Sequence, residues 1–212
     1  MPRARTPFAA GRLWLDFVNT DEAPRHAQPD ALVSFDGYLA WLQGAGLVDA
    51  ARRTALQRRA VEQPASATAA LHEARRIRGA LRPLAERGRQ ASERVTQAAV
   101  LEINRVLGRS TGVRRIEHDP RDGSFTRVFL SAGDAFAALV IPVVESAADA
   151  LVTGELTRVR RCAAEPPCPR VFLDTSRSGR RRWCDMRTCG NQAKAARHRS
   201  ASRTSRRQPD AD

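Results

Sequence analysis

Apolar residues recur at steps of three and four along most of residues 1–156, which is the spacing of helices that bury one face. The pattern is clearest over residues 66–87, where Pro83 could kink the helix or end it early. Residues 11–20, GRLWLDFVNT, fit either a short extended segment or an early helical turn. The pattern predicts helices over residues 34–44, 49–63, 66–87, 92–108 and 133–152.

Residues that favour helix N-caps stand at the starts of two of these helices. Ser34 or Asp36 can cap the first, and Asp49 can cap the second. Each of these side chains can accept a backbone N–H group from the first turn of its helix. The fourth helix is expected to run from Ser92 to Gly108.

A two-residue period replaces the helical period between residues 113 and 130. Segments 113–118 and 124–130 flank DPRDG, a turn-forming sequence, and together they predict a β-hairpin. The following segment, 133–152, is apolar enough to be the central helix of the core. Residues 1–156 are expected to form a mostly helical domain with a small β-hairpin, and the domain is large enough to bury its own core.

All four cysteines fall within 28 residues, with the spacing C-x5-C-x15-C-x4-C: they are Cys162, Cys168, Cys184 and Cys189. Two such pairs can supply four thiolates to one tetrahedral ion, as structural zinc requires. Two disulfides or free redox thiols are the alternatives. The first 20 residues lack the apolar core of about 7–15 residues that a signal peptide needs, so we expect a cytoplasmic protein. Reducing conditions there disfavour disulfides, and one structural Zn²⁺ is the favoured prediction.

The residues around the cysteines predict a knuckle, a hairpin and a helix. Val171–Leu173 fits a strand, Arg180–Trp183 fits the returning strand, and the residues from Cys189 onward fit a helix. This order is typical of a treble-clef-like zinc finger, and it makes the whole chain α+β. Zinc binding is expected to fold residues 157–200, so that loss of Cys184 should unfold them and spare the N-terminal domain.

Positive charge gathers in the same region. Residues 157–212 hold 15 basic and 5 acidic side chains, against 21 and 18 in residues 1–156, so most of the net charge of +13 lies near the finger. Local positive charge attracts polyanions, and DNA is the expected partner, with RNA or an acidic protein as the alternative. The expected DNA contacts are Arg180, Arg181, Arg182, Lys194, Arg197 and Arg199.

The first 156 residues contain no strong catalytic constellation, such as a Gly-rich phosphate loop or H-E-x-x-H, and we expect no enzyme activity. Polar residues beside apolar runs could line a pocket that binds, or alternatively acts on, a small anionic molecule, although caps and ion pairs are the commoner roles. The candidates for this pocket are Asp16, Asn19, Arg75 and Arg78. No apolar run approaches the roughly 18–20 residues of a membrane span, so no membrane partner is expected.

The run FLDTSRSGRRRWCDMRTCGNQAKAARHR carries three linked elements. They are Phe172-x-Asp174-x-Ser176, Arg181-Arg182-Trp183-Cys184, and Cys184-x4-Cys189-Gly190-Asn191 followed by Lys194. Together they resemble the CGNR zinc-finger family of bacteria over about residues 158–200. Gln192 stands where the family name has arginine, and the first cysteine gap has five residues where about four are expected.

The N-terminal element Gly11-x-Leu13-x-Leu15-Asp16-Phe17-x-Asn19-Thr20, with the helical body and the late hairpin, is similar to the ABATE domain, a stress-induced transcription-regulator-like domain. The two resemblances imply a DNA-binding transcription regulator. Residues 1–156 would be its sensor or oligomerisation domain, residues 157–200 its DNA reader, and residues 201–212 a disordered basic tail. A small-molecule effector and a homodimer would fit the same reading.

Overall fold

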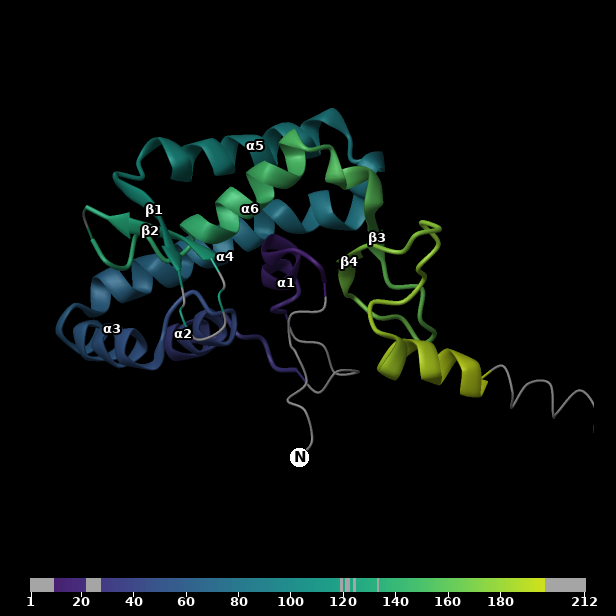
Figure 1. The fold of residues 1–212 in the computed structure, drawn as a ribbon, viewed down its shortest axis with the longest axis horizontal. Helices are drawn as coiled ribbons and strands as arrows, with labels where there is room; N and C mark the ends of the chain where they lie inside the picture. The colour runs from purple at the N-terminus through teal and green to yellow at the C-terminus, as the bar shows by residue number, and fades with distance from the viewer. Residues whose placement is uncertain are drawn as a thin grey trace, which may run out of the picture.

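Six α-helices form the body of the protein in the part that the computed structural model describes, which is residues 10–21, 28–118, 120, 123, 125–132 and 134–196. Figure 1 shows the body with the cysteine-rich segment beside it. Two 3-10 turns, η2 (Gly88–Gln90) and η3 (Glu155–Arg158), follow the fourth and sixth helices. The helices are α1 (Leu13–Val18), α2 (Phe35–Gly44), α3 (Ala50–Glu62), α4 (Pro64–Arg87), α5 (Glu93–Gly108) and α6 (Ile141–Val152).

Capping side chains begin three of the helices, two of them, at Ser34 and Asp49, as the sequence predicted. Ser34, Asp49 and Ser92 each accept a backbone N–H three residues further along, at 3.0, 2.7 and 3.5 Å. The ambiguous segment after Gly11 is helical and forms α1. α4 continues through Pro83 to its end. None of the described helices combines the length and the apolar character needed to span a bilayer.

α6 contacts both α1 and α5 and is the central helix of the body, but it is shorter than the sequence predicts. Residues 135–140 form turns, and the helix begins at Ile141. Pro142 explains this start, because a proline ring fits the first turn of a helix and clashes with the backbone in a helix interior. Val143 and Val144 are fully buried in the core.

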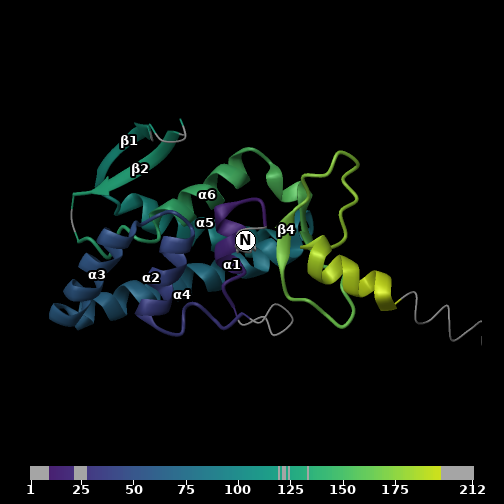
Figure 2. The same ribbon diagram turned by 60° about the horizontal axis from the view of Figure 1, so that its bottom comes forward.

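The predicted hairpin is present. β1 (Gly112–His118) runs antiparallel to β2 (Phe125–Ser131). Arg114 attaches the hairpin to α6, because its guanidinium donates to Glu145 at 2.7 Å and lies 5.2 Å from the ring centre of Phe129. Figures 1 and 2 show the hairpin and the cysteine-rich segment at opposite ends of the molecule.

The cysteine-rich segment contains a two-stranded sheet whose pairing differs from the predicted one. β3 (Val159–Arg161) runs antiparallel to β4 (Val171–Leu173), and residues 180–183 are not a strand. The prediction of a returning strand at Arg180–Trp183 was therefore wrong. Two hydrogen bonds hold this stretch: the buried carboxylate of Asp174 accepts the Arg181 N–H at 3.1 Å, and the Arg182 carbonyl accepts the Ala163 N–H at 2.9 Å.

A helical segment follows the third cysteine, close to where the sequence predicted it. A π-helical turn, η4 (Met186–Gly190), leads directly into α-helical residues 191–196. The predicted fold class is confirmed: a mostly helical N-terminal region with a small sheet, followed by a C-terminal cluster of four cysteines of the zinc-finger kind.

β4 joins the helical body and the cysteine-rich segment into one core. Its residues Val171, Phe172 and Leu173 are at most 4% exposed, and the strand packs against α1 (Figure 2). The Leu173 N–H donates to the Ala10 carbonyl at 2.7 Å. The segment that was expected to fold as a separate module thus shares its apolar interior with the helices.

Candidate metal centre and nucleic-acid interface

The structure brings the four predicted metal ligands together. The Sγ atoms of Cys162, Cys168, Cys184 and Cys189 all lie within 4.8 Å of one another, and all four residues are buried. Cys184 Sγ lies 3.9 Å from that of Cys168 and 3.8 Å from that of Cys189. A disulfide needs about 2.05 Å, whereas four sulfurs about 2.3 Å from one zinc ion are about 3.8 Å apart. The cluster therefore has the size of a tetrahedral zinc site.

Backbone hydrogen bonds set the positions of these ligands. Cys162 follows β3, and its N–H donates to the Arg170 carbonyl at 2.9 Å, which closes the loop that carries Cys168. The Cys184 N–H points at the Cys162 sulfur at 3.4 Å. Cys189 lies on η4. Three separate segments thus converge on one point, and a hydrogen bond that favours a thiolate already reaches Cys162.

Four thiols packed this closely cannot all ionise without a cation. Hydrogen bonds from Cys168 and Cys184 lower the pKa of Cys162. The hydrogen bond with Cys162, together with burial, raises the pKa of Cys184. Burial and the charge on Cys162 raise the pKa of Cys189 to about 12. Four soft, buried sulfur ligands that need a compensating dication are the donor set that zinc prefers.

Asp174 organises the loop between β4 and the third cysteine. It is fully buried, and it accepts the Ser176 N–H at 2.9 Å, the Ser176 hydroxyl at 2.6 Å and the Arg181 N–H at 3.1 Å. Burial acts to raise the pKa of Asp174, but these hydrogen bonds outweigh it and hold the pKa below its usual value. The Asp174-x-Ser176 element, one of those that resemble the CGNR zinc finger, therefore stabilises a turn, which is a role typical of Asp in such a pattern.

Arg181 faces inward, unlike its exposed neighbours Arg180 and Arg182. Its guanidinium donates to the carbonyls of Trp183, at 2.9 Å, and Cys184, and it lies 4.5 Å from the ring centre of Phe172. The side chain braces the loop around the metal cluster. The role of Arg181 within the family-like run is therefore structural. Its charge is directed into the loop and not toward the outer face of the finger.

The remaining predicted DNA contacts divide into two groups. Arg180, Arg182 and Lys194 are exposed, and Arg182 lies 5.4 Å from the ring centre of Trp183. Arg197 and Arg199 lie outside the described residues, as does the tail 201–212 that was predicted to be disordered. Gln192 is exposed on the helical segment that carries Lys194.

The residues predicted to line an anion pocket are used to hold the fold together. Asp16 accepts the Ala10 N–H at 3.0 Å, and Arg75 donates to the carbonyls of Leu32 and Val33. Arg78 donates to both oxygens of Asp30, at 2.6 and 2.9 Å. These contacts are the structural roles that polar residues beside apolar runs commonly have.

Asn19 has a structural role that the sequence did not reveal. Its buried side-chain amide donates to the Val171 carbonyl at 2.8 Å, and its side-chain oxygen accepts the Val171 N–H at 2.9 Å. The side chain therefore pairs with β4 as a neighbouring strand would, across 152 positions of sequence. The only signal in the sequence was the ABATE-like element that ends in Asn19 and Thr20.

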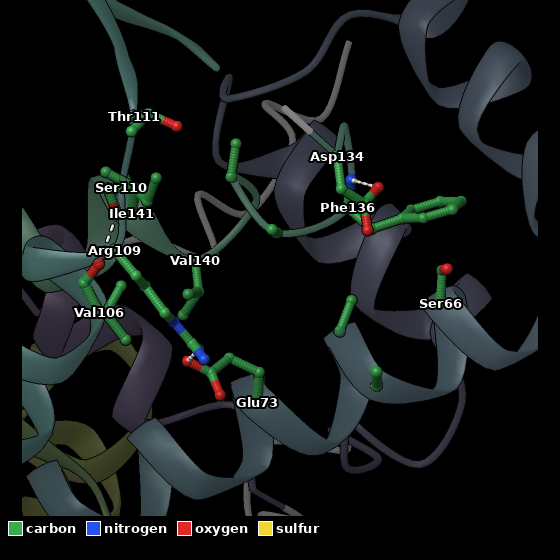
Figure 3. A pocket seen from close by; sticks show the side chains of 14 residues that line it. Ser66, Glu73, Val106, Arg109, Ser110, Thr111, Asp134, Phe136, Val140 and Ile141 are labelled. Atoms are coloured by element: carbon green, nitrogen blue, oxygen red, sulfur yellow. Dashed lines mark hydrogen bonds and ion pairs between the residues drawn. The ribbon is translucent and has the colours of Figure 1, made fainter. Parts of the chain in front are cut away.

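A cavity of about 310 Å³ lies instead between α4, the end of α5 and the turn before α6. Its apolar surface includes Phe136, and its polar groups include Ser66, Glu73 and Arg109. Figure 3 shows Arg109 pointing toward Glu73, with which it forms an ion pair, and Phe136 and Ser66 on the other side. Arg105 also contacts Glu73, at 2.9 Å.

Comparison with protein-family models identifies both parts of the chain. Residues 11–155 match ABATE, described as "Putative stress-induced transcription regulator". Residues 158–202 match the CGNR zinc finger. A search of curated proteins found no match.

Proposed function

Since the chain belongs to the ABATE family and ends in a CGNR zinc finger, we propose that it is a transcription regulator that binds duplex DNA through a zinc-stabilised finger. The observation that carries the proposal is the pairing of a four-cysteine cluster with exposed cations. Arg180, Arg182 and Lys194 extend from the two segments on either side of Cys184.

The electrostatics of the finger support this proposal. A zinc ion with four thiolates carries a formal charge of −2, and the inward-facing Arg181 lies close enough to offset part of it. The outward-facing cations then remain available for phosphate oxygens. Fixed cations on a folded scaffold bind the DNA backbone and set the orientation of a helix that can reach base edges. In this role the protein acts in the cytoplasm, and its cysteines are structural and not catalytic.

Neutralising two finger cations tests the proposal. The double variant Arg180→Gln/Lys194→Gln is expected to bind DNA more weakly, with the slope of log K against log salt reduced by up to about 0.9 for each phosphate that the protein no longer neutralises. The measurement is fluorescence anisotropy on a duplex selected from a random pool by the wild-type protein. A matched control is Arg52→Gln/Arg58→Gln on α3, at the far end of the molecule from the finger.

Equal slopes for the two double variants would remove Arg180 and Lys194 from the interface. A protein that selects no duplex at any salt concentration, with its zinc in place, would refute the proposed function. Competition between the selected duplex and structured RNA at matched salt separates the DNA proposal from the RNA alternative.

We further propose that the helical body is a sensor and that the cavity beside α4 binds its effector. A volume of about 310 Å³ is within the range of small-molecule sites, and the mix of apolar walls with a few polar groups is typical of them. Glu73 and Arg109 offer both an acceptor and a donor to such a molecule. This site differs in place from the anion pocket that the sequence suggested.

Filling the cavity should abolish effector binding. Ala69 lines it from α4, and Ala69→Phe is expected to remove the thermal stabilisation that a metabolite screen finds with the wild-type protein. That stabilisation amounts to about 2.7 kcal/mol at a ligand concentration 100 times the Kd. Thr68→Phe, at an exposed neighbouring position outside the cavity, is the control and should keep the shift. An unchanged shift in Ala69→Phe would place the ligand elsewhere.

A further inference from the structure

A groove of about 610 Å³ lies where the end of α4 and η2 meet η3 and β3. Four arginines line it, from two regions that are distant in the sequence. Arg87 and Arg89 come from the end of α4 and from η2, and Arg160 and Arg161 come from β3. None of them was among the residues predicted to bind a ligand.

A glycine allows the two walls to approach each other. Gly88 has φ +51°, and a Cβ atom at this position would lie 3.0 Å from the Val159 carbonyl oxygen and 3.1 Å from that of Leu156. Only a residue without a side chain fits this contact without strain. On the facing wall, Val159 is buried, while the next two residues of β3 are exposed. The arginines are therefore held on opposite sides of a rigid seam.

In the part of the chain that the structure describes, no acidic side chain pairs with the arginines of the groove. Elsewhere in the body arginines pair with carboxylates, as Arg76 does with Glu102 at 2.6 Å. Among the described residues, none of the four groove arginines forms an ion pair, and Arg160 donates only to backbone carbonyls. Glu86, an acidic residue of the lining, has its carboxylate 3.9 Å from Arg82. Unpaired guanidinium groups gathered in a concavity favour an anionic ligand.

The groove is connected to the finger by direct contacts. Arg158, just before β3, donates to the Ser176 carbonyl at 3.1 Å, and its own carbonyl accepts the Asp174 N–H at 2.9 Å. The loop after Asp174 carries the exposed residues Arg177 and Arg180. The cations of the groove and those of the finger therefore belong to neighbouring segments, and β3 lies between the helical body and the finger (Figure 1).

We propose that this groove binds the sugar-phosphate backbone of the same duplex that the finger contacts, on its flank. The proposal rests on the proposed DNA-binding function. Guanidinium groups bind phosphate oxygens through paired N–H donors, which suits Arg87, Arg89 and Arg161. Contacts of this kind are independent of base sequence, so the groove adds affinity and orientation while the finger carries any sequence preference.

The test compares double variants of the full-length, zinc-loaded protein. Arg89→Gln/Arg161→Gln removes one cation from each wall, and Arg52→Gln/Arg58→Gln on α3 makes the same change of charge elsewhere. On the duplex selected by the wild-type protein, the groove variant should reduce the salt slope by up to about 1.8 relative to the control variant. Its hydroxyl-radical footprint should also be shorter on one flank. Zinc content and circular dichroism establish that each variant is folded.

The outcomes separate this proposal from the proposed function. If the finger variant weakens binding while the groove variant equals the α3 control, the groove proposal is refuted and the DNA-binding function stands. If the wild-type protein binds no duplex, both fail. A free-anion site is the third outcome: inorganic pyrophosphate would stabilise the wild-type protein but not the groove variant, while the DNA salt slope of that variant stayed unchanged. That result would also refute the backbone contact.

Discussion

Replacing Cys184 with alanine is expected to destabilise the helical body as well as the finger. Structural zinc contributes on the order of 10–16 kcal/mol to the folding of small zinc modules, so the variant should lose stoichiometric zinc and the order of the loops around it. β4 lies between those loops and α1, and its three residues are buried against the helices. Loss of the finger would expose this apolar strand and uncover α1, and the melting temperature of the whole protein should fall.

Hydrogen exchange provides the measurement. We expect faster exchange in α1 and β4 of Cys184→Ala, and in wild-type protein treated with a zinc chelator, while Ser178→Ala on an exposed finger loop behaves as the wild type. Unchanged protection of α1 would show that the finger unfolds alone, as the sequence had led us to expect. Retention of one zinc ion per chain in Cys184→Ala would contradict the four-ligand assignment.

Asn19→Ala should separate the two parts of the molecule without touching the metal ligands. The substitution leaves the Val171 N–H and carbonyl without the amide that now pairs with both, in a buried place. An unsatisfied buried polar group costs about 1–3 kcal/mol, and two are created here. The free energy of unfolding should therefore fall by about 2–6 kcal/mol. A chelator should also remove zinc faster.

Urea unfolding and the rate of zinc loss measure the two effects. Asn104→Ala, an exposed position on α5, is the matched control and should change the unfolding free energy little. Asn19→Asp keeps an oxygen for the Val171 N–H, but it loses the N–H that reaches the Val171 carbonyl and adds a buried carboxyl group, so it should also destabilise the protein. A decrease below about 1 kcal/mol in Asn19→Ala would mean that water or a rearranged backbone replaces the amide.

Local signals in the sequence predicted most of the elements correctly. Cap residues such as Ser34 and Asp49 accept a backbone N–H only three positions away, so a short stretch of sequence is enough to predict them. The hairpin was equally local, since a turn sequence joins two alternating segments. The cysteine spacing predicted the cluster because two close cysteine pairs joined by a short loop can supply four ligands to one tetrahedral ion.

The missed features depend on partners that are distant in the sequence. Asn19 and Val171 meet only because the finger packs on α1, and no periodicity encodes that contact. Arg181 was grouped with its exposed neighbours, but it packs on the ring of Phe172 and donates to the Trp183 carbonyl beside the cysteine cluster. The strand wrongly predicted at residues 180–183 has the same origin, since β3 pairs with one edge of β4 while Asn19 and Ala10 occupy the other.

α4 is long enough to line both proposed binding sites, the effector cavity and the arginine groove. The helix lines the cavity with Ser66 and Glu73, and it ends at Arg87 in the arginine groove. Its 24 residues extend roughly 36 Å as a single rod. If a ligand in the cavity displaced α4, it would displace Arg87 at the other end of the same helix as well. The proposed effector site and the proposed DNA-backbone site would then be coupled through one helix.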